Sequence, residues 1–401
     1  MQNVAIIGGG PAGAMTAEAL ARGTVAQGYP AGDPLQVTVF EEKLGWEKPC
    51  GGGVTFKALQ RYPWLMGENC DAKLVREAEF VAANGKSIRL RLRQPVAIYS
   101  RAALNDSLLR RAERAGAKVV RDRILGVERN GEGWLLRGSR GSYCADFLVL
   151  AGGARTRLRG ALAGEFGARD FMLTLGYYVP VRDDLLRIQF FEDFEGYAWS
   201  FPRPDHLSVG ICAKVGECPM VDLRERLEQF MEKFGYPRAG AQVYSHLLPS
   251  LTVESWGSLR LAGKGWAVVG DAAGLVDPLT GEGIYYAMRS GELLAESLLE
   301  ASPESYAARV REEFGRDLAL GARLAPFFYR SDFFGEAVTT RTIQIARRSV
   351  TFAQLLEDLI EGSQGYMGLV ARFCRGFAVT LAETAQSFIR EAFSTPLSAR
   401  T

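Results

Sequence analysis

The chain has 401 residues, of which 47% are hydrophobic and 23% charged, the composition of an ordinary globular protein with two or three packed units. Its 48 basic and 46 acidic residues nearly balance, which argues against a general nucleic-acid binder with a concentrated basic excess. The six cysteines and two histidines fit no zinc or disulfide spacing, and no run of about 18 apolar residues predicts a membrane-spanning helix.

The first 21 residues predict a nucleotide site. Residues 4–7 are typical of a buried strand and residues 14–21 of a helix, and the glycines between them have the G-x-G-x-x-G spacing. Glycines permit a tight turn and a close approach of the backbone to a pyrophosphate, while the helix N-terminus supplies N–H donors and partial positive charge. The predicted nucleotide contacts are Gly8, Gly10, Pro11, Ala12 and Gly13.

A second strand is predicted at residues 35–42, with Glu41 at its end. An acid there can accept hydrogen bonds from a ribose, although it comes later than the usual spacing of about 20 residues. We attribute the delay to an inserted loop at residues 24–34. The alternative is that Glu41 is an ordinary solvated acid.

The stretch WEKPCGGGVTF, residues 46–56, places Cys50 directly before three glycines. Bare glycines let a backbone lie close to a flat ligand. An unperturbed thiol has a pKa of about 8.5, so Cys50 would be mostly protonated at neutral pH. The alternative is that Cys50 is a small buried hydrophobe whose only role is its shape.

Residues 78–93 predict a hairpin with an Asn-Gly turn. Arg101 then opens an amphipathic helix with Leu104, Leu108 and Leu109 on one face, and Ile124 lies in the strand that follows.

Residues 166–254 predict an antiparallel sheet with one helix at residues 221–235. Tyr197, Trp199 and Phe201 alternate along a strand and therefore share one face. Aromatic strand faces are most often core, but residues 171–201 carry more aromatic side chains than one strand needs, so they could line an apolar pocket.

Residues 265–291 predict a further strand at 266–269, a long loop and a helix that begins near Gly281. The segment resembles the G-D-A-x-x…P…G-x-G pattern of FAD-dependent oxidoreductases of the para-hydroxybenzoate hydroxylase fold. The matching positions are Gly270, Asp271, Ala272, Pro278, Gly281 and Gly283.

This resemblance implies FAD as cofactor. It implies that Asp271 binds a ribityl hydroxyl, and that backbone N–H groups at Gly283 and Ile284 face the flavin pyrimidine ring, where they stabilise negative charge. It further places Arg101 near the diphosphate, with a surface arginine as the alternative, and Ile124 near the adenine. Gly153 and Gly270 complete the implied cofactor contacts, while Gly152 stands where many members have an aspartate, which weakens the case for direct reduction by NADPH.

Two further motifs resemble the geranylgeranyl reductases, which saturate isolated prenyl double bonds. One is P-C-G-G at residues 49–52, and the other is Y-x-W-x-F-P…V-G, matched from Tyr197 to Gly210; residues 359–373 also resemble that family's C-terminal helical segment. The resemblance implies that Cys50, Gly51 and Gly52 lie beside the flavin and that Tyr197, Trp199 and Phe201 contact substrate. Reduction of an alkene needs a hydride and then a proton, and a protonated thiol beside the flavin could supply the proton, so Cys50 is the predicted catalytic residue. A redox-sensitive gate and a packing group are the alternatives for this thiol.

Two other functions stay open at this point. One is an FAD-dependent monooxygenase or halogenase acting on an aromatic compound, although Tyr197 and Phe201 break the W-x-W-x-I-P motif of halogenases. The other is a non-catalytic flavin-binding redox sensor built on Cys50. Fold alone does not decide among these functions.

The expected fold class is α/β, a Rossmann-like FAD-binding domain with an inserted antiparallel-sheet substrate domain and a C-terminal helical segment. Partners are expected to be a prenyl lipid or other apolar substrate and an electron donor, NADPH or a redox protein. We predict a cytoplasmic protein without a signal peptide, with peripheral membrane contact by the phenylalanines of residues 327–334 as one alternative to internal packing. The predicted boundaries are 1–75, 95–165 and 255–325 for the FAD-binding domain, 76–94 and 166–254 for the substrate domain, and 326–401 for the helical segment.

Overall fold

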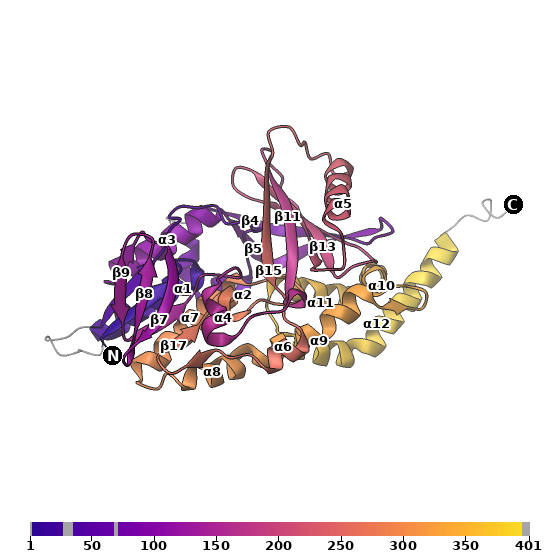
Figure 1. The fold of residues 1–401 in the computed structure, drawn as a ribbon. Helices are drawn as coiled ribbons and strands as arrows, with labels where there is room; N and C mark the ends of the chain where they lie inside the picture. The colour runs from indigo at the N-terminus through magenta and orange to yellow at the C-terminus, as the bar shows by residue number, and fades with distance from the viewer. Residues whose placement is uncertain (1, 27–34, 68–70, 395–401) are drawn as a thin grey trace.

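The computed structural model describes residues 2–26, 35–67 and 71–394. Two large sheets lie side by side, and a group of helices closes one end of the molecule (Figure 1). Residues 27–34, most of the predicted inserted loop, lie outside the described residues, as does Cys70.

The first sheet has six strands in the order β16-β17-β10-β1-β2-β6. Its central strand, β1, pairs in parallel with β2 and β10, and all four residues from Val4 to Ile7 are buried, as a parallel sheet covered on both faces requires. The strands predicted at residues 4–7, 35–42 and 266–269 are confirmed. The bounds are β1 (Asn3–Ile7), β2 (Gln36–Phe40), β6 (Lys118–Val120), β10 (Phe147–Leu150), β16 (Ala262–Gly263) and β17 (Trp266–Val268).

Helices cover this sheet. The helix α1 packs against both α3 and α7, and Gly291 of α7 makes the approach possible, because a Cβ there would lie 2.5 Å from the carbonyl oxygen of Ala12. A small three-stranded sheet, which the sequence did not predict as a unit, lies outside. The bounds are α1 (Pro11–Ala26), α3 (Arg101–Arg114), α7 (Ile284–Leu299), β7 (Ile124–Asn130), β8 (Gly133–Gly138) and β9 (Ser142–Ala145).

The second sheet has eight strands in the order β15-β11-β14-β13-β12-β4-β5-β3. All its pairs are antiparallel except β12 with β4, and α5 (Met220–Lys233) packs on the sheet through Leu223, Leu227 and Phe230. The expected fold class is therefore confirmed. The bounds are β3 (Gly53–Val54), β4 (Ala72–Val81), β5 (Ser87–Tyr99), β11 (Phe171–Val179), β12 (Leu186–Phe190), β13 (Gly196–Pro202), β14 (Leu207–Lys214) and β15 (Gln242–Pro249).

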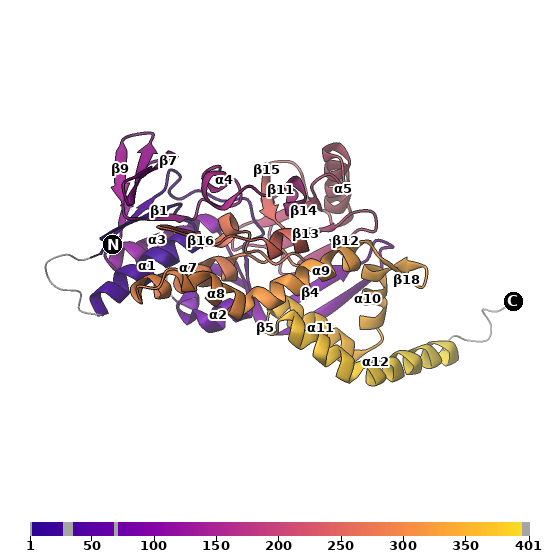
Figure 2. The same cartoon turned by 60° about the horizontal axis from the view of Figure 1, so that its bottom comes forward.

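The C-terminal helices gather at one end of the molecule, beside the long β4–β5 hairpin (Figure 2). Ion pairs of Arg93 on β5 with Asp358 on α11 help to hold them there. None of the helices in the described part of the chain has the length and apolarity needed to cross a bilayer. The bounds are α9 (Arg316–Arg330), β18 (Asp332–Phe333), β19 (Glu336–Ala337), α10 (Val338–Ala346), α11 (Val350–Glu361) and α12 (Tyr366–Ser394), with shorter helices α2 (Phe56–Arg61), α4 (Leu158–Ala163), α6 (Val253–Gly257) and α8 (Ser305–Val310) elsewhere.

The predicted domain division stays a prediction. The β4–β5 hairpin was expected to supply residues 76–94 to the second sheet, and its strands run from Ala72 to Tyr99. The short strand β3 also joins that sheet, next to Cys50. The chain therefore passes between the two sheets near the stretch that carries the thiol.

Candidate functional site

A cavity of about 1070 Å³ lies between the two sheets and reaches the C-terminal helices. Small-molecule sites usually have volumes of about 300–1000 Å³. This cavity is larger, so it has room for a large cofactor and a second ligand. It is lined by Tyr197, Trp199, Phe201 and the predicted cofactor contacts except Gly13 and Gly270.

The N-terminal glycines divide into two roles. A Cβ at Gly8 would lie 2.4 Å from the carbonyl oxygen of Ala151, and one at Gly13 would lie 1.9 Å from that of Gly8, so these two positions allow strand and helix to pack closely. A Cβ at Gly10 would meet no atom within 4 Å and would project into open space. Gly10 therefore leaves the cavity open at the N-terminus of α1, where backbone N–H groups attract anions.

Glu41 follows β2 on the cavity wall. Its carboxylate accepts a hydrogen bond from the backbone N–H of Gly9 at 2.7 Å and from that of Lys43 at 2.8 Å. Ile124, at the start of β7, also lines the cavity. The structure thus joins Glu41 to the glycine loop, and the roles predicted for Glu41 and Ile124 toward ribose and adenine stay predictions.

Arg101 opens α3 and is 3% exposed, so the alternative of a surface arginine is wrong. One Nη donates to Asn105 Oδ1 at 3.3 Å, but the Nε of Arg101 has no hydrogen-bond partner within the described chain. Buried guanidinium groups normally pair all their donors. An orphaned donor on the cavity wall fits an anionic ligand.

Cys50 is held in place from the second sheet. Its carbonyl oxygen accepts hydrogen bonds from Arg203 Nη2 at 2.6 Å and from Ser208 Oγ at 2.9 Å. A Cβ at Gly51 would lie 2.6 Å from the Phe201 ring, and one at Gly52, whose φ is +85°, would lie 2.2 Å from the carbonyl oxygen of Tyr99. The bare backbone after the thiol is therefore needed for close packing.

Positive charge surrounds the Cys50 sulfur. Burial alone would raise the pKa of this thiol, but Arg101, the N–H of Gly52, Lys48 and Arg203 together lower it below its ordinary value. The thiolate is therefore more populated than the sequence suggested.

Arg203 and Glu47 form a buried pair that the sequence reading missed. The Arg203 side chain is fully buried and pairs with the Glu47 carboxylate. Glu47 also accepts hydrogen bonds from Ser100 Oγ at 2.6 Å and from the backbone N–H groups of Arg101 and Ala102 at 2.7 and 3.0 Å. The pair ties the Cys50 loop to α3, and the only sequence signal was an arginine between two prolines at the end of the aromatic motif.

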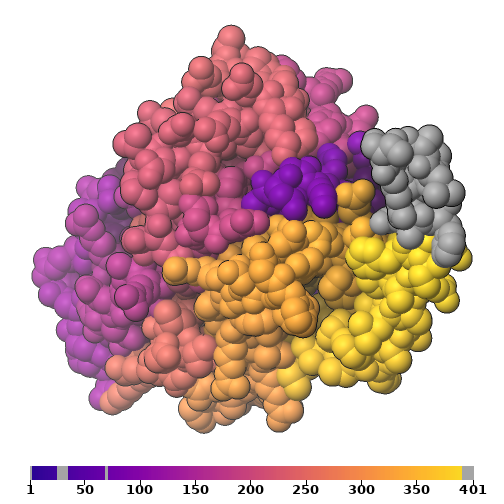
Figure 3. All heavy atoms as spheres, turned by 90° about the vertical axis from the view of Figure 1, so that its right-hand side faces the viewer, coloured from indigo at the N-terminus to yellow at the C-terminus, as the bar shows by residue number. Residues whose placement is uncertain are grey.

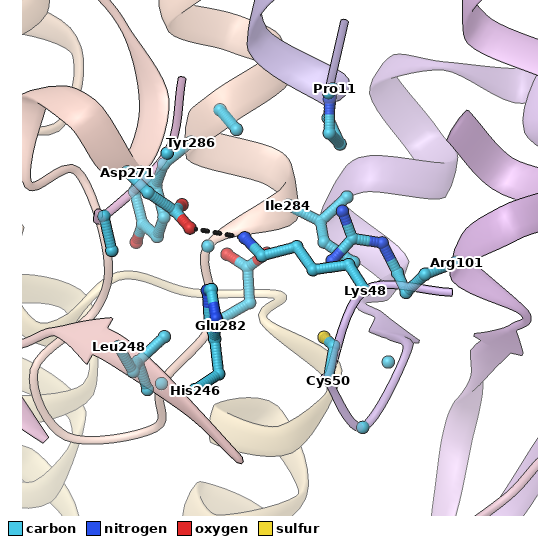
Figure 4. Close-up of a pocket in the computed structure, with 18 of the residues that line it drawn as sticks. Pro11, Lys48, Cys50, Arg101, His246, Leu248, Asp271, Glu282, Ile284 and Tyr286 are labelled. Atoms are coloured by element: carbon cyan, nitrogen blue, oxygen red, sulfur yellow. Dashed lines mark hydrogen bonds and ion pairs between the residues drawn. The ribbon is translucent and has the colours of Figure 1, made fainter. Parts of the chain in front are cut away.

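Three polar side chains meet across the cavity (Figure 4). Lys48 Nζ contacts Asp271 Oδ2 at 2.7 Å, and although burial raises the pKa of Asp271, this lysine keeps it below its ordinary value. Burial and the charge of Lys48 lower the pKa of His246 to about 3, so its imidazole is neutral. The sequence reading missed Lys48, two residues before the thiol, and His246, on β15.

Glu282 lies at the N-terminus of α7, between the glycines of the G-x-G motif. Its Oε1 accepts a hydrogen bond from the backbone N–H of Tyr285 at 2.8 Å. Burial raises the pKa of Glu282 to about 7, and the figure shows its carboxyl group in the same space as Lys48 and His246 (Figure 4). Glu282 is therefore a further titratable acid in the cavity, beside Glu41 and Asp271, and the sequence reading passed over it as the variable position of a motif.

Gly152, Gly153 and Gly270 lie where the two nucleotide motifs meet. Gly153 has a φ of +75°, and a Cβ there would meet no atom within 4 Å. Gly270 has a φ of +58° and does not line the cavity. A Cβ at this position would lie 2.8 Å from the Cβ of Ala12, so Gly270 packs against the first motif. Gly270 is thus brought to the first motif as a packing position.

The predicted aromatic face lines the cavity and also belongs to the packed interior. A Cβ at Gly210 would lie 2.3 Å from the Trp199 ring, so the glycine of the V-G pair makes room for that ring. The Nε1 of Trp199 is buried without a hydrogen-bond partner among the described residues. Beyond Trp199, the cavity continues between apolar side chains of three helices, including Phe328, Ile343, Leu356, Leu359 and Ile360.

Tyrosines from three elements fix the loop after Asp271. Tyr197 donates to the Thr280 carbonyl oxygen at 2.6 Å, and Tyr329 donates to that of Leu279 at 2.5 Å. Tyr366, the first residue of α12, donates to Asp277 Oδ1 at 2.6 Å. These contacts connect the predicted cofactor loop with the substrate-facing sheet and with the C-terminal helices.

Comparisons with known proteins agree with this arrangement. The family described as FAD dependent oxidoreductase matches residues 70–296. The geranylgeranyl diphosphate reductase of a Synechocystis strain is 26% identical over 393 residues, covering 88% of this chain and 91% of that protein. The digeranylgeranylglycerophospholipid reductase 2 of Methanothermobacter thermautotrophicus is 30% identical over 353 residues, covering 79% and 85%.

Solved structures share the fold at low identity. A geranylgeranyl bacteriochlorophyll reductase-like protein from Thermoplasma acidophilum has a TM-score of 0.68 at 22% identity, covering 89% of this chain and 99% of that one. A triple mutant of the flavin-dependent brominase Bmp2 has a TM-score of 0.70 at 19% identity, covering 92% and 97%.

FAD fits the residues that line the cavity. The orphaned Nε of Arg101 offers a donor for a diphosphate, and the open space at Gly10 and Gly153 leaves the backbone accessible to a ligand. The cofactor is FAD, and the protein is an oxidoreductase. The chain belongs to the geranylgeranyl reductase family of FAD-dependent oxidoreductases.

Proposed function

We propose that this chain reduces isolated carbon–carbon double bonds in the prenyl chain of a lipid. The observation that carries the proposal is one continuous cavity, in which a dinucleotide-type cradle opens into an apolar extension lined by β12, β13 and the C-terminal helices. A prenyl chain presents only apolar surface along its length, so its binding depends mainly on apolar burial. The names of the two relatives point to the same substrate class.

The cofactor would be held by residues from both nucleotide motifs. The N-terminal glycine loop and Arg101 would hold the diphosphate, Glu41 the ribose, Ile124 the adenine and Asp271 a ribityl hydroxyl. FAD, when bound, supplies the hydride for the reduction. The remaining contacts would come from Cys50, Gly51, Gly52, Gly153, Gly283 and Ile284, while Gly13 and Gly270 would act through packing.

Saturating an alkene also needs a proton, and we propose Cys50 as its donor. The thiol lies on the cavity wall, and the cations around it lower its pKa, which makes it a stronger acid but a smaller reservoir of protons at neutral pH. Glu282 is the competing candidate, because burial raises its pKa to about 7, close to the pH at which it would act. In either case the alkene gains a hydride at one carbon and a proton at the other, and solvent returns the proton to the acid.

The aromatic face would orient the alkene and exclude water. Tyr197 is fixed by its hydrogen bond to Thr280, and Trp199 is fixed against Gly210. Side chains with fixed rotamers hold a reactant with less loss of entropy than mobile ones. Tyr197, Trp199 and Phe201 therefore serve as the proposed substrate contacts.

The electron donor is proposed to be NADPH or a redox protein. Gly152 lies on the cavity wall where related flavoproteins carry an aspartate, and this difference favours the redox protein. Steady-state reduction of the holoprotein by NADPH under anaerobic conditions distinguishes the two.

The test starts from the FAD-loaded protein reduced with dithionite in the absence of oxygen. Geranylgeranyl diphosphate or a prenyl ether lipid is added, and mass spectrometry counts the hydrogen pairs gained. Cys50→Ala and Glu282→Gln are compared with Cys144→Ala, which replaces an exposed cysteine outside the cavity. Loss of the proton donor is expected to slow reoxidation of the flavin by substrate about 10²- to 10⁴-fold.

The competing function is an oxygen-using halogenase or monooxygenase. It is favoured by the fold shared with flavin-dependent halogenases such as the brominase, and a shared fold does not define chemistry. If no prenyl compound gains hydrogen, and air together with bromide and a phenol yields a brominated product, the reductase proposal is overturned.

A further inference from the structure

The C-terminal helix α12 has the reverse of the usual polarity. A helix on a globular protein normally turns its apolar side chains inward. In α12 the side facing α11 carries Arg372, Thr380 and Glu383, and Thr380 is only 5% exposed. Leu369 packs against the interior and the Phe373 ring contacts Phe352 of α11, but most of the other large apolar side chains of α12 face outward.

These outward side chains form a continuous stripe, which we call the α12 stripe. From Met367 to Phe388 its members follow one another after 3, 7, 4 and 7 residues, close to whole numbers of helical turns, so they lie along one face of the helix. Met367 is 57% exposed, Leu381 55% and Phe388 55%. The α12 stripe consists of Met367, Val370, Phe377, Leu381, Phe388 and Ile389; two further exposed apolar residues of α12, Phe373 and Val379, are not counted in it.

Charge is sorted across α11 and α12. Asp358 pairs with Arg93 and Arg372, Glu361 accepts a hydrogen bond from the backbone of Arg93, and Glu383 contacts Ser349. Acidic side chains thus turn toward the protein interior.

Basic side chains remain outside. Arg375, at the edge of the α12 stripe, and Arg347, at the end of α10, are exposed, and neither has an acidic partner among the residues that the structure describes. The residue after Arg347, Arg348, has its guanidinium 4.2 Å from the centre of the Phe388 ring, which places the end of α10 beside the α12 stripe. The outer face is therefore apolar with arginines at its border.

We propose that α12 lies on the surface of a lipid bilayer that contains anionic lipids, with the α12 stripe inserted among the acyl chains. An interfacial helix of this kind combines burial of apolar side chains with attraction between arginines and anionic headgroups. A second copy of the chain fits less well, because a symmetric pairing of two α12 helices would bring Arg375 against the same basic border.

The position of α12 links this surface to the cavity. Tyr366 and Gly365 line the cavity, and Met367, the next residue, begins the α12 stripe. Figure 3 shows α12, in yellow, beside the orange α9 and α10, with the surface hollowed between them. A lipid could therefore pass from the bilayer to the cavity, a consequence that rests on the proposed function, whereas the docking does not.

The test uses the full FAD-loaded chain and vesicles without any substrate. Flotation is measured with vesicles of phosphatidylcholine alone and with vesicles that also contain phosphatidylglycerol. Replacing Val370, Phe377 and Leu381 together by serine is expected to weaken binding to the mixed vesicles about tenfold or more. The matched control replaces three exposed apolar residues on other elements and outside the cavity, Leu74, Val221 and Val243, by serine and is expected to bind as the parent does.

Charge is tested separately. Arg347→Gln with Arg375→Gln is expected to lower the affinity for the mixed vesicles about fivefold for each arginine, and to leave binding to phosphatidylcholine unchanged. Equal binding by the serine variant and the parent would overturn the proposal. A dimeric parent that binds no vesicles and becomes monomeric in the serine variant would also overturn it and would assign the α12 stripe to a second copy. Prenyl reduction is assayed in parallel with detergent-dispersed lipid, so failure of docking and failure of the proposed activity give different results.

Discussion

The thiol of Cys50 owes its acidity both to its own loop and to side chains that are distant in the sequence. Arg101 comes from the start of α3, Arg203 follows β13, and Lys48 lies in the same loop as the thiol. Burial opposes these charges but does not cancel them. The sequence identified the thiol and its glycines, whereas the cations became visible only once the two sheets were placed together.

Removing the charge of Lys48 should make Cys50 less reactive. In Lys48→Gln the pKa of the thiol rises, so less thiolate is present at pH 7 and alkylation by iodoacetamide slows. Peptide-resolved mass spectrometry follows Cys50 as a function of pH. Lys43→Gln, on the same loop, is the control and should leave the pH dependence of Cys50 alkylation unchanged. If Lys48→Gln also leaves this pH dependence unchanged, the electrostatic explanation is contradicted.

Glu282 should make the cofactor-free protein lose stability as the pH rises. Its pKa is about 7 in the folded state against an ordinary 4.5, so the folded state holds its proton more tightly than the unfolded state. Its contribution is complete below about pH 4.5 and is lost between there and about pH 7, with an upper limit of about 3 kcal/mol. Glu282→Gln should flatten this dependence in urea unfolding measured at pH 5 and pH 8. Glu254→Gln, at an exposed position, should have the same pH dependence of unfolding as the parent.

Spaced motifs in the sequence identified residues that line the cavity. Gly8, Gly10, Asp271 and Trp199 stand in spaced patterns whose physical purpose is general, and all four line the cavity. Arg203, His246 and Glu282 were missed because single polar residues in a loop or strand give no periodic signal. Their significance depends on contacts with residues far away in the sequence.

At the scale of elements, aromatic side chains and glycines fit together as pairs. The V-G pair of the motif on β14 lies opposite the aromatic face of β13, and Gly210 pairs with Trp199 in the sheet register. In the sequence, this glycine resembles a break in a strand. In the structure, its missing side chain leaves room for an indole ring. The strands could be predicted from alternation, but this pairing could not, because register is set by tertiary packing.

Gly210→Ala should displace the Trp199 ring. The new Cβ would lie 2.3 Å from the ring, so the indole must shift or the strands must separate, at a cost of about 1–3 kcal/mol. Because Trp199 borders the cavity, binding of a prenyl lipid should weaken as well. Thermal unfolding and lipid binding by tryptophan fluorescence measure both effects. Gly126→Ala, where a Cβ meets no atom within 4 Å, is the control, and equal behaviour of the two variants would contradict the packing argument.

At the scale of the whole molecule, the cofactor cavity connects elements that the sequence separates widely. The parallel sheet, the inserted sheet and the helical end were predictable from strand and helix patterns together with the two nucleotide motifs. The outer three-stranded sheet and the reversed polarity of α12 were not. An exposed apolar stripe follows the same period as a buried one, so the sequence cannot say which way the helix faces.

FAD should stabilise the molecule as a whole, because the proposed binding mode brings it against residues from both motifs. At 100 times its dissociation constant, a ligand that binds only the folded state adds about 2.7 kcal/mol to the free energy of unfolding. FMN lacks the adenosine half, so it should add less when both are compared at equal concentration in chemical denaturation. Equal stabilisation by the two flavins would contradict the roles proposed for Glu41 and Ile124.

Three tyrosines donate hydrogen bonds to the loop at residues 277–280, and these bonds affect the order in which ligands bind and leave. Tyr366 connects that loop to the first turn of α12, while Tyr197 connects it to the aromatic face. A lipid lodged in the apolar extension would press on the same loop that borders the flavin, and would hinder any motion that lets the cofactor leave. We therefore expect the flavin to bind before the lipid and to leave after it. Dissociation of the flavin should be slowest while a lipid is bound.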